Sequence, residues 1–250
     1  MKILRKVYTF YGLLVFTILF IIFFIPLLIP IIFPSQYKLT GILNRWWARL
    51  IFIFVGIPFS VKCESKPDPK KQYIFCPNHF SYLDIPVLGL NPNNSIFVGK
   101  NDMENIPLFG FMYRKLHITV DRAKLKSRYS TMLRTLEALE KGKSLVIFPE
   151  GGIMTDKEPV MAPFKDGAFR ASIEKQIPIV PVTIPYNWII LPPDQFLLHW
   201  RPLSVIFHEP IDPAEYTLKD VDLLKDRVRR VIEEELKRHL AHEDHPRTVG

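Results

Sequence analysis

The chain opens with a long stretch of apolar positions. Residues 7–34 contain no charged side chain, and a helix of that length could cross about 30 Å of hydrocarbon. A second apolar segment, residues 46–59, is interrupted only by Arg49, and its two tryptophans suit the headgroup level of a bilayer. Pro26 and Pro30 are expected to kink or end the first helix near its last turn. These segments predict membrane attachment by a spanning helix, by a hairpin sunk in one leaflet, or by a plain anchor.

After this region the pattern changes to short apolar runs separated by polar loops and helical periodicities. Runs rich in β-branched and aromatic residues predict strands at 73–76, 95–98, 116–120, 144–148, 177–184 and 203–208. Helical spacing of apolar residues predicts helices over 129–139 and 221–236. The alternation predicts an α/β fold, with a mixed, largely parallel sheet flanked by helices and preceded by an apolar helical membrane-binding segment.

A charged, proline-containing link at residues 66–72 marks the predicted boundary between these two parts. At 250 residues, the chain is long enough for one domain with a sizeable core and an attachment. We expect a membrane-associated helical segment at 1–65, an α/β domain at 66–240 and a polar tail at 241–250.

Composition and charge narrow the setting. The chain is 48% hydrophobic and 23% charged, which is typical of globular or membrane-bound proteins. Its formal charge of +8 favours a polyanion, and the apolar N-terminus favours an anionic bilayer over nucleic acid. Cys63 and Cys76 do not suggest a disulfide scaffold, so we expect a catalytic domain on the reducing, cytoplasmic side of a membrane. No small-residue cleavage site follows the first apolar run, which argues against a signal peptide.

His79 and Asp84 are the strongest candidates for chemistry. They stand five positions apart, directly after the first predicted strand, and a histidine held by a carboxylate makes a general base at neutral pH. Each has a structural alternative, because Ser81 and Asp84 have the spacing of a helix capping box and a loop histidine can simply be hydrogen-bonded. Cys76 lies inside the predicted strand, where burial is expected in place of a nucleophilic role.

Further polar residues follow the ends of the next predicted strands. Lys100 follows the second strand, Arg122 the third, and Glu150 with Gly151 the fourth. In open α/β sheets, ligands bind outside the carboxyl ends of the strands. One crevice is therefore predicted to hold a base, two cations and a glycine turn. Taken singly, each cation could equally be a solvated surface charge.

Four blocks of the sequence, taken in order, resemble the glycerophospholipid acyltransferase family. They are the His-x-x-x-x-Asp segment 79–84, the Lys-to-Gly segment 100–110, Phe-Pro-Glu-Gly at 148–151, and the proline-bearing run 179–185. The resemblance covers roughly residues 70–190. It implies that His79 abstracts a proton from an acceptor hydroxyl while Asp84 orients and charges the imidazole.

The resemblance also implies substrate-binding roles for Lys100, Arg122, Glu150, Gly151 and Lys165. The cations match basic family positions. The glutamate and glycine match residues that line the glycerol-phosphate pocket or shape the loop near the reacting carbonyl. The chain departs from the family at residues 152–153, where Gly-Ile replaces the usual Thr-Arg, whose arginine contacts phosphate. The acceptor headgroup therefore stays open at this point.

The reaction implied by the resemblance moves a fatty acyl group from a thioester, acyl-CoA or acyl carrier protein, to the sn-2 hydroxyl of 1-acylglycerol-3-phosphate. The expected partners are a lysophospholipid, the acyl donor and a lipid bilayer, with no nucleic acid, metal or redox cofactor. Another lysolipid acceptor, including an amino-acid-linked one, is the alternative, as is a non-catalytic membrane-binding module. The sequence contains no Gly-x-Ser-x-Gly elbow, phosphate-binding loop or dinucleotide fingerprint.

Overall fold

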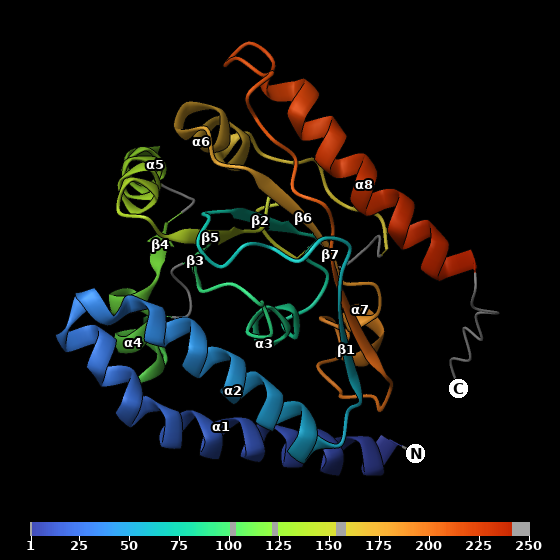
Figure 1. Ribbon diagram of the computed structural model, residues 1–250. Coiled ribbons are helices and arrows are strands. Elements are labelled where there is room, and N and C mark those ends of the chain that lie inside the picture. The colour runs from blue at the N-terminus through green and yellow to red at the C-terminus, as the bar shows by residue number, and fades with distance from the viewer. Residues whose placement is uncertain (1, 101–103, 122–124, 154–158, 242–250) are drawn as a thin grey trace.

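The computed structural model describes residues 2–100, 104–121, 125–153 and 159–241 (Figure 1). The helices are α1 (Lys2–Ile32), η1 (Pro34–Gln36), α2 (Tyr37–Val55), α3 (Asp84–Leu88), α4 (Phe109–Leu116), α5 (Leu125–Glu140), α6 (Gly167–Lys175), α7 (Asn187–Ile190) and α8 (Val221–Ala241). The strands are β1 (Phe59–Cys63), β2 (Ile74–Pro77), β3 (Ser95–Lys100), β4 (Ile118–Val120), β5 (Ser144–Ile147), β6 (Ile179–Thr183) and β7 (Leu203–Phe207).

The strands form a single seven-stranded sheet in the order β1-β7-β6-β2-β5-β3-β4. Each neighbouring pair is parallel except β6 and β7, which run antiparallel. The central strand β2 is buried at every position, as expected for a strand covered by helices on both faces. The prediction of a mixed, largely parallel α/β sheet is confirmed, and all six predicted strands are present.

The side chains of β2 alternate between two hydrophobic cores, because successive strand residues point to opposite faces of the sheet. Ile74 and Cys76 pack in the core shared with α5, α6 and α8. Phe75 faces the other core, which includes residues of α1, α2 and α3. Figure 1 shows the two helical layers on opposite sides of the sheet. The sheet edge that carries the polar residues therefore lies between two packed layers.

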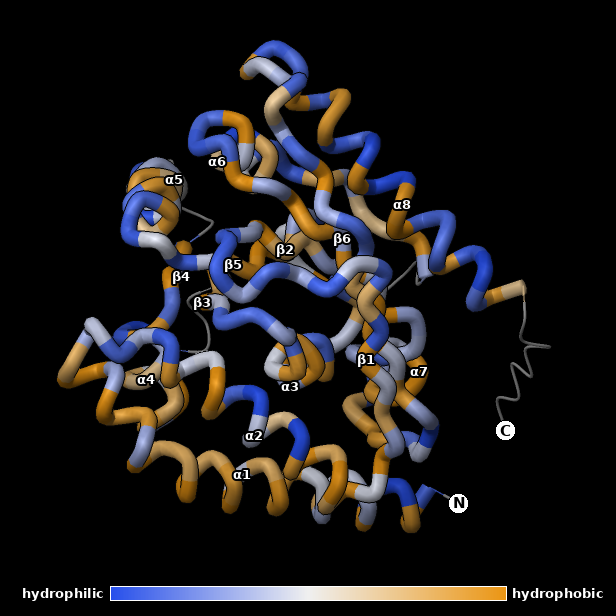
Figure 2. The backbone as a smooth tube through the Cα atoms, viewed as in Figure 1, coloured by the Kyte–Doolittle hydropathy of each residue, from blue (hydrophilic) through white to orange (hydrophobic). Residues whose placement is uncertain are grey.

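The helices α1 and α2 form a hairpin, with η1 at the turn between them (Figure 1). Among the described residues, α1 is the one helix long and apolar enough to cross a membrane, by length and composition alone. Figure 2 shows that hydrophobic residues cover nearly its whole length. The helix α1 continues through Pro26 and ends at Ile32, two residues after Pro30, so its end falls close to the prolines that were expected to kink or end it. Leu27, buried against α4, packs this last part of the helix onto the protein.

The first strand, β1, was not expected from the sequence. It pairs in parallel with β7, so the sheet draws strands from both sides of the boundary placed at residues 65–66. The hairpin is also joined to the same core, since Ala48 and Phe52 of α2 are almost fully buried there. Of the predicted tail, only Ala241 lies within the described residues.

Phe52 tests whether the hairpin contributes to folding stability. Its side chain is 1% exposed in the core, whereas Phe54, two residues later, is 55% exposed. Phe52→Ala should lower the free energy of unfolding by about 3–5 kcal/mol, because it removes a buried ring and leaves a cavity. Phe54→Ala, measured by the same denaturant titration in the same detergent, should change it by less than about 0.5 kcal/mol. Equal effects would show that the hairpin is only loosely attached.

Candidate active site

The candidate active site lies where the three central strands end. His79 follows β2, Glu150 follows β5 and Asn187 follows β6, and β2 is the parallel neighbour of both other strands. Parallel strands carry their carboxyl ends to one edge of the sheet, which is where open α/β folds bind their ligands. The structure thus brings together residues that are up to 108 positions apart in the chain (79 and 187).

His79 and Asp84 form a direct side-chain pair. The Nδ1 atom of His79 lies 2.9 Å from Oδ2 of Asp84. Because an ionised carboxylate only accepts hydrogen bonds, Nδ1 carries the proton and the Nε2 atom carries the free lone pair. The His79 side chain is 12% exposed, so this second nitrogen has limited access from outside. This is the tautomer that a general base requires.

Asp84 is fully buried and its carboxylate is held by several donors. Oδ2 accepts the backbone N–H groups of Phe80 and Ser81, at 2.9 and 3.0 Å, as well as the imidazole. Oδ1 accepts the side-chain amide of Asn187 at 2.8 Å. Buried charge is costly unless it is hydrogen-bonded, so these donors keep the carboxylate in place. Asp84 accepts the Ser81 N–H, as in a capping box, but α3 begins at Asp84 itself, with Leu83 at the N-cap and no side-chain cap.

The backbone and ring of His79 are fixed by the segment after β5. The imidazole stacks on Phe148, with ring centroids 3.9 Å apart and an angle of 24° between the planes. The backbone N–H of His79 donates to Oε1 of Glu150 at 2.7 Å. Together with the hydrogen bond from Nδ1 to Asp84, these contacts restrain the ring in position and in rotation. This limits the entropy lost on reaching a reactive geometry.

Glu150 is 4% exposed, and both of its carboxylate oxygens accept backbone N–H groups, from His79 and from Ala162. Burial raises the pKa of Glu150 to about 7, and the two N–H donors oppose that rise. Of the two roles that the resemblance implies for Glu150, the geometry supports shaping the loop: the carboxylate connects the His79 backbone to the loop after β5.

Gly151 and Lys165 lie together at a small pocket of about 130 Å³ next to Phe148. Gly151 has φ +80°, a conformation that favours glycine, and a Cβ there would approach Lys165 Nζ to 2.5 Å. The N–H of Gly151 donates to the carbonyl of Phe148 at 3.1 Å, so this amide is engaged in the turn. Phe148 therefore separates the imidazole from a pocket that carries one of the expected cations.

The other two expected cations cannot be placed in the site. Lys100 ends β3 and pairs with Val120, the last residue of β4, but its side chain is outside the described part of the structure. Arg122 lies entirely outside the described residues. Their roles stay predictions, supported only by strand ends at the same edge of the sheet.

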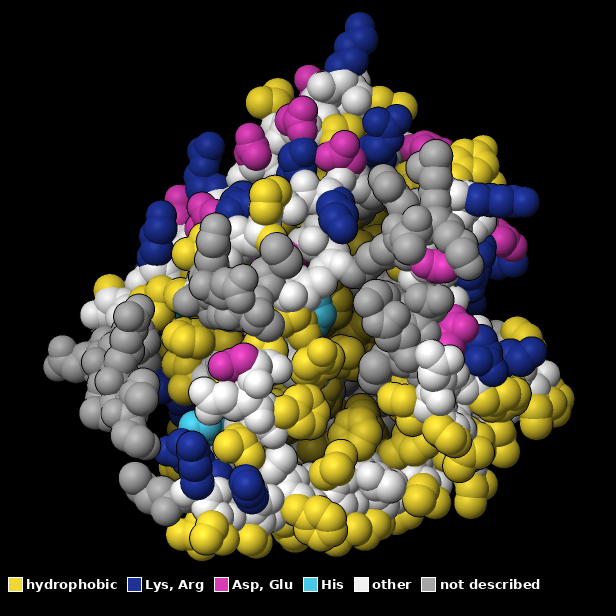
Figure 3. All heavy atoms as spheres, turned by 180° about the vertical axis from the view of Figure 1, so that it is seen from behind, with side chains coloured by type: hydrophobic (Ala, Val, Ile, Leu, Met, Phe, Trp, Pro, Cys, Tyr) yellow, Lys and Arg dark blue, Asp and Glu magenta, His cyan; other side chains and the backbone are white. Residues whose placement is uncertain are grey.

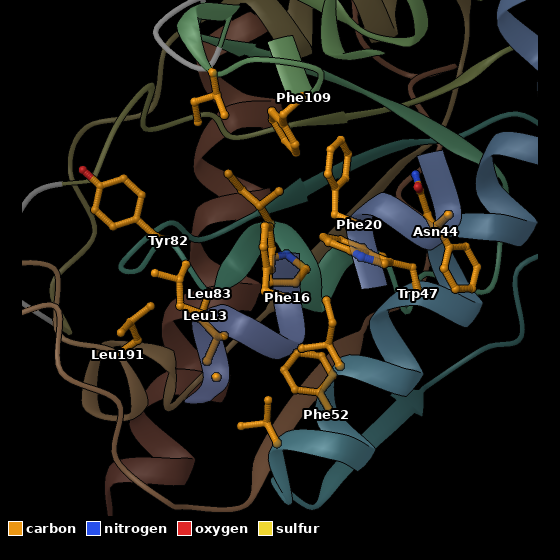
Figure 4. A pocket seen from close by; sticks show the side chains of 18 of the residues that line it. Leu13, Phe16, Phe20, Asn44, Trp47, Phe52, Tyr82, Leu83, Phe109 and Leu191 are labelled. Atoms are coloured by element: carbon orange, nitrogen blue, oxygen red, sulfur yellow. The ribbon is translucent and has the colours of Figure 1, made fainter. Parts of the chain in front are cut away.

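An apolar cavity of about 430 Å³ lies between the hairpin and the α/β part, lined by α1, α2, α3, α4 and the loop after α7. Figure 3 shows hydrophobic side chains gathered around a hollow on this side of the molecule. In Figure 4, Tyr82 and Leu191 lie on one side of the cavity, and Asn44 and Trp47 lie on the other. Tyr82 and Leu83, which line the cavity, belong to the turn 79–84 that carries His79.

Sequence reasoning missed two contributors to the site, Phe148 as a stacking partner and Asn187 as a donor to Asp84. Phe148 was part of a recognised block but had no assigned role, and nothing in the sequence distinguishes Asn187 from an ordinary loop asparagine. Cys76 is fully buried, and burial raises the pKa of its thiol, which confirms the expectation of a structural residue.

A buried His–Asp pair at the carboxyl ends of the strands is typical of an enzyme site, and an apolar cavity is typical of a site for an apolar ligand. Comparisons with known proteins identify the class further. The family model described as Acyltransferase matches residues 59–185. A 1-acyl-sn-glycerol-3-phosphate acyltransferase of Haemophilus influenzae is 30% identical over 213 residues, which cover 78% of this chain and 83% of that protein. The Saccharomyces cerevisiae protein of the same name is 29% identical, over 81% of this chain and 68% of its own length.

A solved structure agrees with these matches. The crystal structure of the 1-acyl-sn-glycerophosphate (LPA) acyltransferase PlsC from Thermotoga maritima has a TM-score of 0.79, at 20% identity, over 98% of this chain and 99% of that one. At that identity, the likeness shows the fold. The chain belongs to the glycerophospholipid acyltransferase family.

Glu150 gives a pH prediction. Its pKa is raised from 4.5 to about 7 in the folded protein, so between these values the folded state keeps a proton that the unfolded state has lost. This stabilisation is complete below pH 4.5 and lost as the pH rises through 7. Relative to Glu150→Gln, the wild-type protein should lose up to about 3 kcal/mol of unfolding free energy across that range. Denaturant titrations at half-unit pH steps measure it, with exposed Glu215→Gln as the control. A constant difference between wild type and Glu150→Gln would contradict the assignment.

Proposed function

We propose that this protein transfers a fatty acyl group from an acyl thioester to the sn-2 hydroxyl of 1-acylglycerol-3-phosphate, giving phosphatidate. The observation that carries the proposal is the His79–Asp84 pair, in which protonated Nδ1 donates to the carboxylate, in a turn that also lines an apolar cavity. The names of the related proteins support the acceptor. The intact pair, together with Glu150, argues against a non-catalytic membrane-binding module.

The chemistry needs one base and no acyl-enzyme. His79 Nε2 takes the proton from the acceptor hydroxyl as its oxygen attacks the thioester carbonyl carbon. The resulting imidazolium is stabilised by Asp84, 2.9 Å from Nδ1. When the tetrahedral intermediate collapses, the C–S bond breaks and the imidazolium proton passes to the thiolate, releasing the free thiol of coenzyme A or of acyl carrier protein. The developing oxyanion requires N–H donors, and the engaged Gly151 amide leaves the following loop amides as the candidates.

The structure has one pocket suited to an acyl chain and a separate one suited to the headgroup of the acceptor. The apolar cavity beside Tyr82 suits an acyl chain, whose exposure to water costs about 0.8 kcal/mol per CH₂. The small pocket with Lys165 suits an anionic headgroup, because a lysine ammonium binds phosphate as a point charge. Lys100 and Arg122 are proposed to complete the headgroup site from the ends of β3 and β4.

The bilayer is the proposed second partner of this protein. Large apolar side chains of α1 are exposed along its length, including Ile3 at 78% and Ile25 at 70%. Trp46 on α2 and Trp200 before β7 are exposed by 54% and 63%, as suits residues at the headgroup level. Trp200 also donates to the carbonyl of Gly56 at 2.6 Å, which ties this loop to the end of α2. We place the catalytic part on the cytoplasmic side, where soluble acyl thioesters are available and free cysteines persist.

A second acceptor is favoured by one observation. Gly152 and Ile153 occupy positions where the family commonly carries Thr and a phosphate-contacting Arg, so the phosphate grip of this chain differs from the common pattern. Another lysolipid, including an amino-acid-linked one, is therefore the alternative acceptor for the same reaction.

The assay that tests the proposal uses purified full-length protein in detergent, a labelled acyl thioester and a panel of lysolipids. Lysophosphatidate should be the best acceptor, and His79→Ala should lower turnover by about 10²–10⁴-fold, the range for losing a general base. His199→Ala, which removes a histidine outside the site, is the matched control. Wild-type-like turnover by folded His79→Ala would exclude the mechanism, and preference for another lysolipid would replace the acceptor.

The cavity predicts acyl-chain selectivity. Asn44 lies on the side of the cavity opposite Tyr82, so Asn44→Phe should shorten the space available to an acyl chain (Figure 4). We expect kcat/KM to fall about tenfold or more for a long-chain acyl thioester and by less than twofold for a short-chain one, since only the long chain reaches the new ring. Ser130→Phe, which adds the same ring to an exposed position on α5, should leave both values unchanged. Equal losses for both chain lengths would place the acyl group elsewhere.

A further inference from the structure

We infer that Asn187 is a positioning residue of this active site, which holds the Asp84 carboxylate and through it sets the basicity and orientation of His79. The inference rests on the proposed function for the reaction that it affects. It adds Asn187 as a third residue to the His79–Asp84 pair that the sequence predicts. The Asn187 Nδ2 atom donates to Oδ1 of Asp84 at 2.8 Å, and both side chains are buried, at 1% and 0% exposure.

The orientation of the Asn187 amide follows from chemistry alone. An ionised carboxylate can only accept, so the NH₂ group must face Asp84, and a flipped amide would set two oxygens against each other. Oδ2 of Asp84 is already used by the imidazole and by the N–H groups of Phe80 and Ser81. Among the described residues, Oδ1 accepts a hydrogen bond from Asn187. Asn187 therefore balances the carboxylate from the side opposite the imidazole.

The two ends of the Asn187 side-chain amide are in different surroundings. Its Oδ1 atom is buried and has no hydrogen-bond partner among the described residues. A buried acceptor without a partner costs stability, but an apolar side chain here would leave Oδ1 of the buried Asp84 carboxylate without the amide donor. The residue is thus unfavourable for folding at one end of its amide and useful at the other, where it meets the catalytic carboxylate.

The surrounding contacts fix Asn187 relative to the base. Asn78, the residue before His79, makes two hydrogen bonds to the backbone of Ile184, at 3.0 and 2.8 Å. The Ser81 hydroxyl donates to the carbonyl of Leu191 at 2.7 Å. These bonds tie the turn 78–84 to the chain on both sides of Asn187. The segment that carries the donor is therefore attached to the turn that carries the pair, as suits a group that acts through another residue.

The decisive variant is Asn187→Asp, because it keeps the shape and changes only what the side chain can donate. At low pH the introduced carboxyl is protonated, since a second buried negative charge beside Asp84 is disfavoured, and it donates to Oδ1 as the amide does. As the pH rises that proton is lost and two carboxylates face each other. The ratio of variant to wild-type kcat should therefore be near one at low pH and fall at least tenfold as the pH rises.

Asn187→Ala removes the donor at every pH. We expect kcat to fall roughly 10–100-fold, the scale seen for groups that orient a functional residue, with both KM values within twofold of wild type. Asn93→Asp is the matched control for Asn187→Asp. Asn93 is also buried and donates one side-chain hydrogen bond, to the carbonyl of Asp68, away from the site. This variant should lower the melting temperature and leave the ratio to wild-type kcat independent of pH.

A second readout does not depend on acyl transfer. Carbethoxylation of His79 by diethylpyrocarbonate, followed by mass spectrometry of the peptide that contains it, reports the neutral imidazole. In Asn187→Asp the added negative charge favours the imidazolium, so the pH dependence of His79 modification should move to higher pH, and in Asn93→Asp it should not move. If the wild-type protein is active and the ratio of Asn187→Asp kcat to wild-type kcat does not change with pH, the inference is overturned and the proposed function stands. An inactive wild-type enzyme would overturn the proposed function, and an unshifted His79 modification profile would then overturn the inference as well.

Discussion

The buried carboxylate of Asp84 is the interaction on which the rest of the site depends. A charge with no exposure to solvent must be matched by donors, and here they come from an imidazole, two backbone amides and one side-chain amide. Meeting that requirement forces the turn after β2 to close on itself and brings the segment after β6 against it. Local backbone structure and catalytic geometry are therefore two results of one electrostatic constraint.

The segments that follow the three central strands each contribute different residues around that charge. The segment after β5 supports the histidine from behind, through the Phe148 ring and the Glu150 carboxylate. The segment after β2 carries the base itself, and the segment after β6 carries Asn187. Phe148 touches both the imidazole and the small pocket that contains Lys165. A group that fills this pocket is thus one ring away from the base.

The sequence predicts those features that have a strong local pattern. The buried strands read as apolar runs, and the His79–Asp84 spacing together with the family resemblance predicts a catalytic pair. β1 could not be found in this way, because its residues are mostly exposed and so it lacks an apolar pattern. The part of α1 after Pro26 packs against α4, a long-range contact that no local pattern predicts. Asn187 becomes visible only when the fold sets it against a carboxylate 103 residues away.

The helix α1 has two different surroundings along its length. One face carries exposed residues such as Ile25, while Phe16 and Phe20 on the other line the apolar cavity. With this helix in a bilayer, as proposed, the hydrophobic thickness of the membrane biases its tilt, and a tilt of α1 moves one wall of the cavity. Membrane thickness in turn depends on the length of the acyl chains that such an enzyme installs. If α1 lies in the bilayer as proposed, a change in membrane thickness would therefore reach the shape of the cavity through this one helix.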